Sequence, residues 1–201
     1  LTPADAQTYH NRGLVYVDKG MPDQALADYN EAIRLNPNYT RAFVNRGGLY
    51  FKKKDYGLAI ADFVKAVALD PNMPEARYNL GQAYYFSGNY DGAIVSYSET
   101  LRLSPTWADA YMQRGLAQQK KKNFDTAIAD YTAGLKIAPQ NSDIFHNRGN
   151  AYIDKGLPDL AVADFNEAIR LNPKAAKTYL ARGNAQYRAK KPDLALIDYS
   201  E

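Results

Sequence analysis

The sequence contains no cysteine, which excludes disulfide bonds and metal sites built on thiolates. No apolar run approaches 18 residues, so we expect no membrane-spanning helix. Neither glycine-rich phosphate-binding pattern, Gly-x-x-x-x-Gly-Lys-Ser/Thr or Gly-x-Gly-x-x-Gly, is present. The formal net charge is only +3, whereas a nucleic-acid surface requires a wider basic excess. We therefore expect a soluble chain, of a compartment that the sequence does not identify, whose main partner is not nucleic acid.

The sequence does contain one motif that recurs every 34 residues. Glycine returns once in each copy, at Gly13, Gly47, Gly81, Gly115, Gly149 and Gly183. Alanine returns at Ala25, Ala59, Ala93, Ala127, Ala161 and Ala195, and an aromatic residue follows each alanine by four positions. A fixed period of this length is the signature of stacked helix-turn-helix units.

Each copy is predicted to hold two helices. In the first half, the recurring residues are spaced to share one helical face, as at Tyr9, Arg12, Gly13 and Tyr16. The second half repeats this spacing, and Pro22 suits the first turn of its helix while Pro37 ends it. A glycine inside a helix costs about 1 kcal/mol relative to alanine. Its retention in all six copies predicts that another backbone passes too close to admit a Cβ atom.

These columns of small and aromatic residues resemble the tetratricopeptide repeat, and the resemblance covers essentially the whole chain. It implies an all-α, right-handed solenoid of antiparallel helix pairs forming one domain over residues 1–201. The predicted repeats are 6–39, 40–73, 74–107, 108–141, 142–175 and a partial sixth at 176–201, with 1–5 as the tail of a preceding repeat. Because no polar capping helix closes the array, we expect this segment to belong to a longer protein.

No arrangement of side chains predicts catalysis. The two histidines, His10 and His146, occupy equivalent positions four repeats apart and cannot meet at one metal ion. No Ser/His/Asp grouping is apparent, and the carboxylates fall on repeating helical faces. We therefore predict no catalytic residue, cofactor or metal site in this segment.

Two charged columns change together along the repeats. Arginine stands at Arg12, Arg46, Arg114, Arg148 and Arg182, and aspartate stands at Asp28, Asp62, Asp130, Asp164 and Asp198. In the third repeat, Leu80 replaces the arginine and Ser96 replaces the aspartate. Because a buried charge requires a partner, we hypothesise an ion pair joining the two helices of each repeat. The alternative is an arginine whose stem covers apolar surface while its head remains in water.

The residue before the arginine is a carboxamide in five copies: Asn11, Asn45, Asn79, Gln113 and Asn147. A carboxamide offers one acceptor and two donors, which match an unpaired peptide backbone. The resemblance implies that the first helices line a concave groove in which the ligand binds. The carboxamide column is similar to the asparagine ladder of O-linked N-acetylglucosamine transferases and of the armadillo repeats of importins. The alternative is a solvated polar position copied with the repeat. The chaperone-tail clamp of this family is not matched, because His10 and Glu75 stand where it requires lysine.

The third repeat departs from the pattern by carrying aromatic residues on its first helix. Tyr78, Tyr85 and Phe86 fall with Asn79 and Gln82 on the expected inner face, which is the composition of an interaction hot spot. The alternative is that some of these rings only pack on the next repeat. The predicted peptide-binding set, beyond the carboxamide column, is Phe51, Tyr78, Gln82, Tyr85, Phe86 and Asn150.

The sequence thus predicts a scaffold that binds an extended peptide or a partner helix. Two alternatives remain, a substrate-targeting arm of a larger enzyme such as a glycosyltransferase, and self-association through the terminal repeats. Clusters such as Lys52-Lys53-Lys54 recur in alternate repeats at the expected end of the first helix, where cations favour the helix dipole. They leave RNA binding as a minor alternative.

Overall fold

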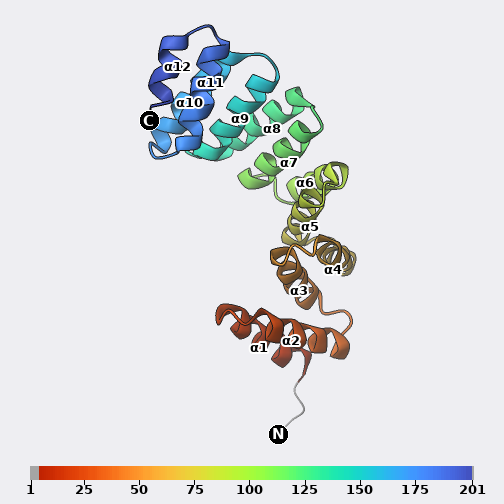
Figure 1. The fold of residues 1–201 in the computed structure, drawn as a ribbon. Helices are drawn as coiled ribbons and strands as arrows, with labels where there is room; N and C mark the ends of the chain where they lie inside the picture. Colours follow the sequence, from red (N-terminus) through yellow and green to blue (C-terminus); the bar gives the residue numbers. More distant parts are fainter. Residues whose placement is uncertain (1–4, 201) are drawn as a thin grey trace. The chain divides into compact units, whose positions relative to one another are not determined.

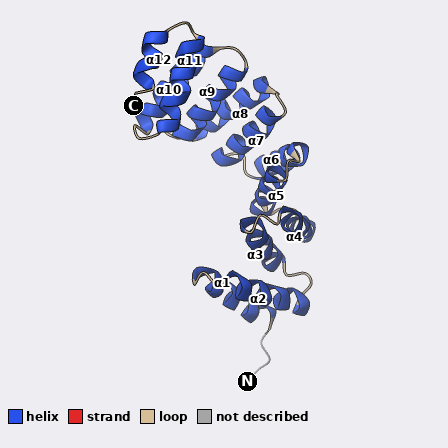
Figure 2. Ribbon diagram, in the orientation of Figure 1, coloured by secondary structure: helices blue, strands red, loops and turns tan. Residues whose placement is uncertain are grey.

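The computed structural model describes residues 5–200, and every regular element in that range is an α-helix (Figures 1 and 2). The helices are α1 (Ala6–Asp18), α2 (Pro22–Leu35), α3 (Thr40–Lys52), α4 (Tyr56–Leu69), α5 (Pro74–Phe86), α6 (Tyr90–Leu103), α7 (Ala108–Lys120), α8 (Phe124–Ile137), α9 (Ser142–Asp154), α10 (Pro158–Leu171), α11 (Ala176–Arg188) and α12 (Pro192–Asp198). The predicted all-helical fold is confirmed. Of the predicted tail at residues 1–5, all but Asp5 lies outside the described residues.

The helices pack in consecutive pairs, with each odd-numbered helix lying against the even-numbered helix that follows it. The chain divides into two compact units. The first unit, Leu1–Leu103, contains α1 to α6, and the second, Ser104–Glu201, contains α7 to α12. Within each unit, the second helix of one pair also packs on the first helix of the next. That all six repeats form one continuous solenoid stays a prediction.

Proline marks the ends of the second helix as the sequence indicated, and a residue of positive φ follows each first helix. Pro22 opens α2, and α2 ends at Leu35, two residues before Pro37. The turn between paired helices contains one residue with positive φ, which is glycine in three repeats and lysine in the other three: Gly20, Lys54, Gly88, Lys122, Gly156 and Lys190. One lysine of each alternate cluster, Lys54, Lys122 or Lys190, therefore occupies a conformation that costs a non-glycine residue about 1 kcal/mol or more.

The invariant glycine of each first helix lies against the aromatic residue of the paired second helix. A Cβ atom on Gly13 would lie 2.6 Å from the Tyr29 ring, and one on Gly47 would lie 2.9 Å from the Phe63 ring. The prediction that a Cβ is excluded is correct, but the predicted neighbour was wrong, because the nearest atoms belong to a ring and not to a backbone. In the first five repeats these rings are almost completely buried and form the core together with the alanine column, whereas Tyr199 of the sixth repeat is 47% exposed.

No helix in the described part of the chain is both long enough and apolar enough to cross a membrane.

Candidate functional site

The arginine column forms two-pronged ion pairs inside the repeats. Arg46 donates from Nε to Asp62 Oδ2 at 2.8 Å and from Nη2 to Asp62 Oδ1 at 2.6 Å. The same geometry joins Arg12 to Asp28, Arg114 to Asp130, Arg148 to Asp164, and Arg182 to Asp198. The hydrogen bonds to Asp62 raise the pKa of the Arg46 guanidinium above its ordinary value. These ion pairs join the first helix of each of these repeats to the second.

Three of these arginines also donate a hydrogen bond to the preceding repeat, a contact that the repeat pattern of the sequence did not predict. Arg46 donates from Nη1 to Asn30 Oδ1 at 2.7 Å, and α2 carries that asparagine. Arg148 contacts Thr132 and Arg182 contacts Asn166 in the same way. Each of these arginines therefore joins three helices.

The third repeat satisfies its polar group without an ion pair. Ser96 donates its hydroxyl to the Gly92 carbonyl at 2.8 Å within α6, and Leu80 is buried in a core cluster with Phe63 of the preceding repeat. By the repeat spacing, Val64 stands where Asn30 stands one repeat earlier. An apolar residue thus replaces the acceptor at the one junction whose arginine is absent.

The carboxamide column lies on first helices, with Asn11, Asn45 and Asn79 on α1, α3 and α5 of the first unit and Gln113 and Asn147 on α7 and α9 of the second. Asn11 is exposed and the other four are partly exposed. Within residues 5–200, the side chains of Asn79, Gln113 and Asn147 make no hydrogen bond to protein. Their donors and acceptors are therefore free to bind a ligand.

His10 lies beside the first two carboxamides of this column and contacts both, a role that the sequence did not predict. Asn45 donates from Nδ2 to His10 Nε2 at 2.8 Å, and His10 Nδ1 lies 3.4 Å from Asn11 Oδ1. Both contacts are satisfied by the neutral ring that carries its hydrogen on Nδ1. Burial lowers the pKa of His10, which favours this neutral form. The carboxamide of Asn45 is thus already engaged by protein.

A pocket of 360 Å³ lies between α9 and α11, the first helices of the fifth and sixth repeats. Its lining consists of Asn150, Ile153, Ala181, Asn184, Tyr187 and Arg188. Ala181 stands at the carboxamide position of the sixth repeat, so the missing amide leaves space there. Asn150, which was predicted, and Asn184 are equivalent residues one repeat apart, and that equivalence is the signal that would have identified the second.

The aromatic residues predicted as one hot spot fall into two groups. The Tyr78 ring packs on the buried Tyr97 ring with centroids 5.6 Å apart. Phe86 instead contacts Tyr85, at 5.5 Å, and Phe51, at 5.4 Å, from the neighbouring repeat. Gln82, on α5, is partly exposed.

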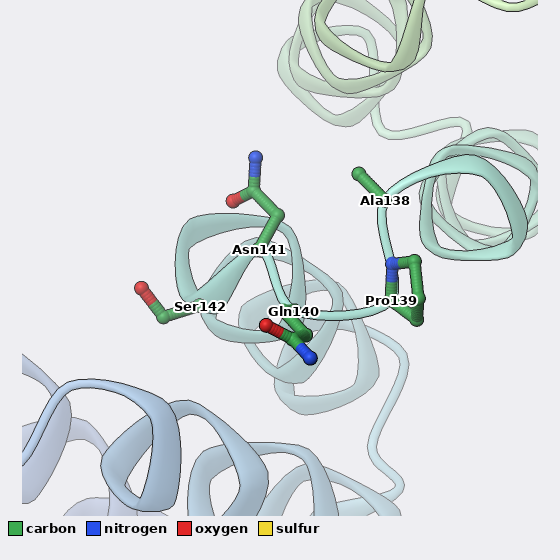
Figure 3. Close-up of a pocket in the computed structure, with 5 residues that line it drawn as sticks. All are labelled: Ala138, Pro139, Gln140, Asn141 and Ser142. Atoms are coloured by element: carbon green, nitrogen blue, oxygen red, sulfur yellow. The ribbon is translucent and has the colours of Figure 1, made fainter.

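A larger hollow of 590 Å³ lies over the loop between α8 and α9, where five consecutive residues line it: Ala138, Pro139, Gln140, Asn141 and Ser142. Their side chains do not converge on a common point (Figure 3). The Asn141 carboxamide oxygen accepts hydrogen bonds from the backbone N–H groups of Asp143 and Ile144 and so caps α9. The loop under this hollow therefore caps α9, and its side chains do not form a binding site. Among the described residues, no cluster of three or more side chains could hold a metal ion.

Comparisons with known proteins agree with this architecture. A family model described as tetratricopeptide repeat matches residues 6–39 and 108–141, and one described as TPR repeat matches residues 47–88, 81–122 and 149–190. Among curated proteins, none matches the sequence.

Solved structures include several similar folds. The MamA protein is 30% identical over 86% of this chain and 94% of that chain, with a TM-score of 0.79. YrrB, described as a TPR protein with an unusual peptide-binding site, is 23% identical over 94% of this chain and 93% of that chain, with a TM-score of 0.77. PilW, a type IV pilus biogenesis factor, is 18% identical over 97% of this chain and 90% of that chain, with a TM-score of 0.85.

Proposed function

The chain belongs to the tetratricopeptide repeat family, and from this premise we propose that it is a protein-interaction scaffold whose first helices bind an extended peptide. The observation that carries the proposal is the unengaged carboxamides on the first helices of each unit, Asn79 in the first unit and Gln113 and Asn147 in the second. Each presents donors and an acceptor to solvent from a helix that is itself held rigidly by its core ring and, in most repeats, by its ion pair. The peptide-binding site named for YrrB supports the same use of the fold.

An extended peptide fits these carboxamides better than a partner helix does. A helix satisfies its backbone N–H and C=O groups internally, so it would leave the carboxamides without backbone partners. An extended chain presents both groups along its length and can exchange hydrogen bonds with successive amides of one unit, such as Gln113 and Asn147. Recognition of this kind depends little on the peptide sequence. Side-chain preference then comes from neighbouring surfaces such as the pocket between α9 and α11.

The experiment compares two triple variants in binding to peptides selected from a random 12-residue displayed library. The first replaces the free carboxamides by alanine: Asn79→Ala, Gln113→Ala and Asn147→Ala. The matched control replaces exposed polar residues of second helices: Gln24→Ala, Lys65→Ala and Lys136→Ala. A hydrogen bond of about 1 kcal/mol corresponds to about a fivefold loss of affinity, so the loss of all three corresponds to about a hundredfold.

Fluorescence anisotropy with labelled selected peptides measures this loss, and circular dichroism verifies the helix content of each variant. The control triple should keep its affinity, and backbone N-methylation of the peptide should weaken binding to the unmodified chain. Equal affinities of the carboxamide triple and the parent chain would refute the backbone-binding mechanism.

Two other functions stay open as proposals. A targeting arm of a larger enzyme would use the same peptide-binding surface, with catalysis outside this segment. Self-association is favoured by one observation, the exposed apolar side chains of Leu194, Leu196 and Ile197 on α12. Analytical ultracentrifugation of the parent chain and of the Leu196→Ser/Ile197→Ser variant tests self-association. Only an interface at α12 would make the sedimentation coefficient depend on these two residues.

A further inference from the structure

Five aromatic rings form a continuous cluster at one edge of the first unit, and we call it the aromatic platform: Phe51, Tyr56, Tyr85, Phe86 and Tyr90. They lie at the ends of α3 and α5 and the starts of α4 and α6 (Figure 1). Phe86 is the central ring, with centroid distances of 5.4 Å to Phe51, 5.5 Å to Tyr85 and 6.0 Å to Tyr56. Tyr85 continues the cluster to Tyr90 at 5.5 Å. Two of the five, Tyr56 and Tyr90, come from second helices and belong to none of the sequence-predicted sites.

The central ring is also the most solvent-accessible. Phe86 is 55% exposed, although it is a large apolar side chain at the end of a helix. Every other repeat carries a charged residue at this position: Asp18, Lys52, Lys120, Asp154 and Arg188. The fold therefore does not need an apolar side chain there. Phe86 follows Asn79 by seven residues, so the two share one face of α5 at a separation of about 10 Å along the helix.

Positive charge lies beside the platform. Lys52 occupies the Phe86 position on α3, which contacts α5, and Lys54 lies in the following turn. Within the described residues neither lysine forms an ion pair, whereas Lys53 is bound to Asp23 at 2.7 Å. The nearby carboxylates Asp55 and Asp91 lie at the N-termini of α4 and α6, where the positive end of each helix dipole offsets their charge.

We infer that the aromatic platform binds an aromatic side chain of the peptide, with an aspartate or glutamate beside it contacting Lys52. The inference rests on the proposed function, since Asn79 on the same helical face would hold the adjacent peptide backbone. Aromatic pairs prefer offset or edge-to-face contact, and the exposed Phe86 ring offers both to an incoming ring. The positive charge of Lys52 beside the bound aromatic side chain would then favour peptides that carry an acidic residue next to the aromatic one. Single-stranded nucleic acid is disfavoured as the occupant, because the chain's net charge is only +3.

The test uses Phe86→Lys, which removes the ring and adds a positive charge. Lysine occupies this position naturally in the second and fourth repeats, so the variant is compatible with the fold. Val95→Lys on α6 is the control, because Val95 is 64% exposed and its replacement also exchanges an apolar side chain for a lysine without removing a ring. A random 12-residue displayed library is selected in parallel against the parent chain, Phe86→Lys, Val95→Lys and the carboxamide triple variant.

Peptides enriched by the parent chain should contain an aromatic residue next to an acidic one, and Val95→Lys should enrich the same peptides. Synthetic fluorescein-labelled copies should bind Phe86→Lys at least tenfold more weakly, although attraction by charge alone would make them bind more tightly. Lys52→Gln should weaken binding severalfold and reduce its dependence on salt concentration.

Unchanged or tighter binding by Phe86→Lys overturns the inference, and so does enrichment without the aromatic–acidic pair. An oligouridine 20-mer serves as the nucleic-acid competitor. If it displaces the labelled peptide, and if it binds Phe86→Lys more weakly than the parent chain, the platform is a nucleic-acid site and the inference is overturned. If only the carboxamide triple loses the peptides, the proposed function stands and the platform does not. If neither variant loses them, or if no peptide is enriched, both proposals fail.

Discussion

The ion pair between Arg46 and Asp62 supports a prediction whose size and asymmetry follow from the structure. The perturbations are Arg46→Leu, Asp62→Ser and the double variant, which installs the pair of residues that the third repeat carries naturally. Arg46 is 19% exposed and Asp62 is 6% exposed, and two hydrogen bonds of 2.8 and 2.6 Å join them. Each single variant leaves a charged group without its main partner. The double variant leaves none.

The two single variants should differ in cost. After Asp62→Ser, Arg46 retains its bond to Asn30 and its position over the Phe43 ring, so the loss is about 2 kcal/mol. After Arg46→Leu, the more deeply buried Asp62 has no cation, and we expect a loss of about 3 kcal/mol. The double variant should lose about 3 kcal/mol instead of the sum of about 5, which gives a coupling energy of about 2 kcal/mol.

Urea unfolding followed by circular dichroism measures these losses, with the unfolding slope checked for constancy across the four proteins. The control cycle uses Arg12→Leu and Asp28→Ser, because Arg12 is 55% exposed and its pair should show a smaller coupling that high salt removes. Additive losses at Arg46 and Asp62 would refute the buried-pair reasoning. A larger loss from Asp62→Ser than from Arg46→Leu would refute the argument from burial.

Two further predictions concern the glycine column and His10. Gly47→Ala should destabilise the chain by about 1–3 kcal/mol in urea unfolding, because its Cβ would lie 2.9 Å from the Phe63 ring. Gly48→Ala, on the same helix with no atom within 4 Å of its Cβ, should instead stabilise it by about 0.5–1 kcal/mol, and equal effects would contradict the packing argument. For His10, burial lowers the pKa below its ordinary value of 6.5, so the unfolded chain binds more protons than the folded chain between the two pKa values. Stability should therefore be full above pH 6.5 and decline as the pH falls through the folded pKa, and a His10→Met variant with an undiminished decline would exclude this residue as a cause.

The fold was predictable because the 34-residue repeat allows each position to be compared with the equivalent positions in the other repeats. The recurring glycines and prolines marked the helices and their ends without any alignment to other proteins. The nature of the contact at Gly13 was not predictable, since the period shows that a Cβ is excluded but not which atoms exclude it. Likewise the alternation of Gly20 with Lys54 was visible, yet only the backbone shows that this lysine has positive φ.

The candidate site was predictable where it depends on one helix and unpredictable where it depends on two. The carboxamide column follows from helical spacing, and its residues lie on the first helices. Side-chain direction is what spacing could not supply. His10 turns toward Asn45 of the next repeat, and Tyr78 packs on Tyr97 of the paired helix. The repeat pattern therefore does not predict contacts between repeats, because it identifies equivalent residues but not which of their side chains touch.

The inter-repeat bond from Arg46 to Asn30 yields a prediction that the sequence columns alone did not suggest. In the parent chain, Asn30→Val should destabilise the protein by about 0.5–1.5 kcal/mol, because Arg46 loses a hydrogen-bond acceptor. In the Arg46→Leu/Asp62→Ser background the same change should stabilise it, since a valine facing a leucine reproduces the relation of Val64 to Leu80. Urea unfolding of the four proteins measures the reversal of sign. The same sign in both backgrounds would show that Asn30 affects stability independently of Arg46. The conclusion that Arg46 joins three helices would then fail.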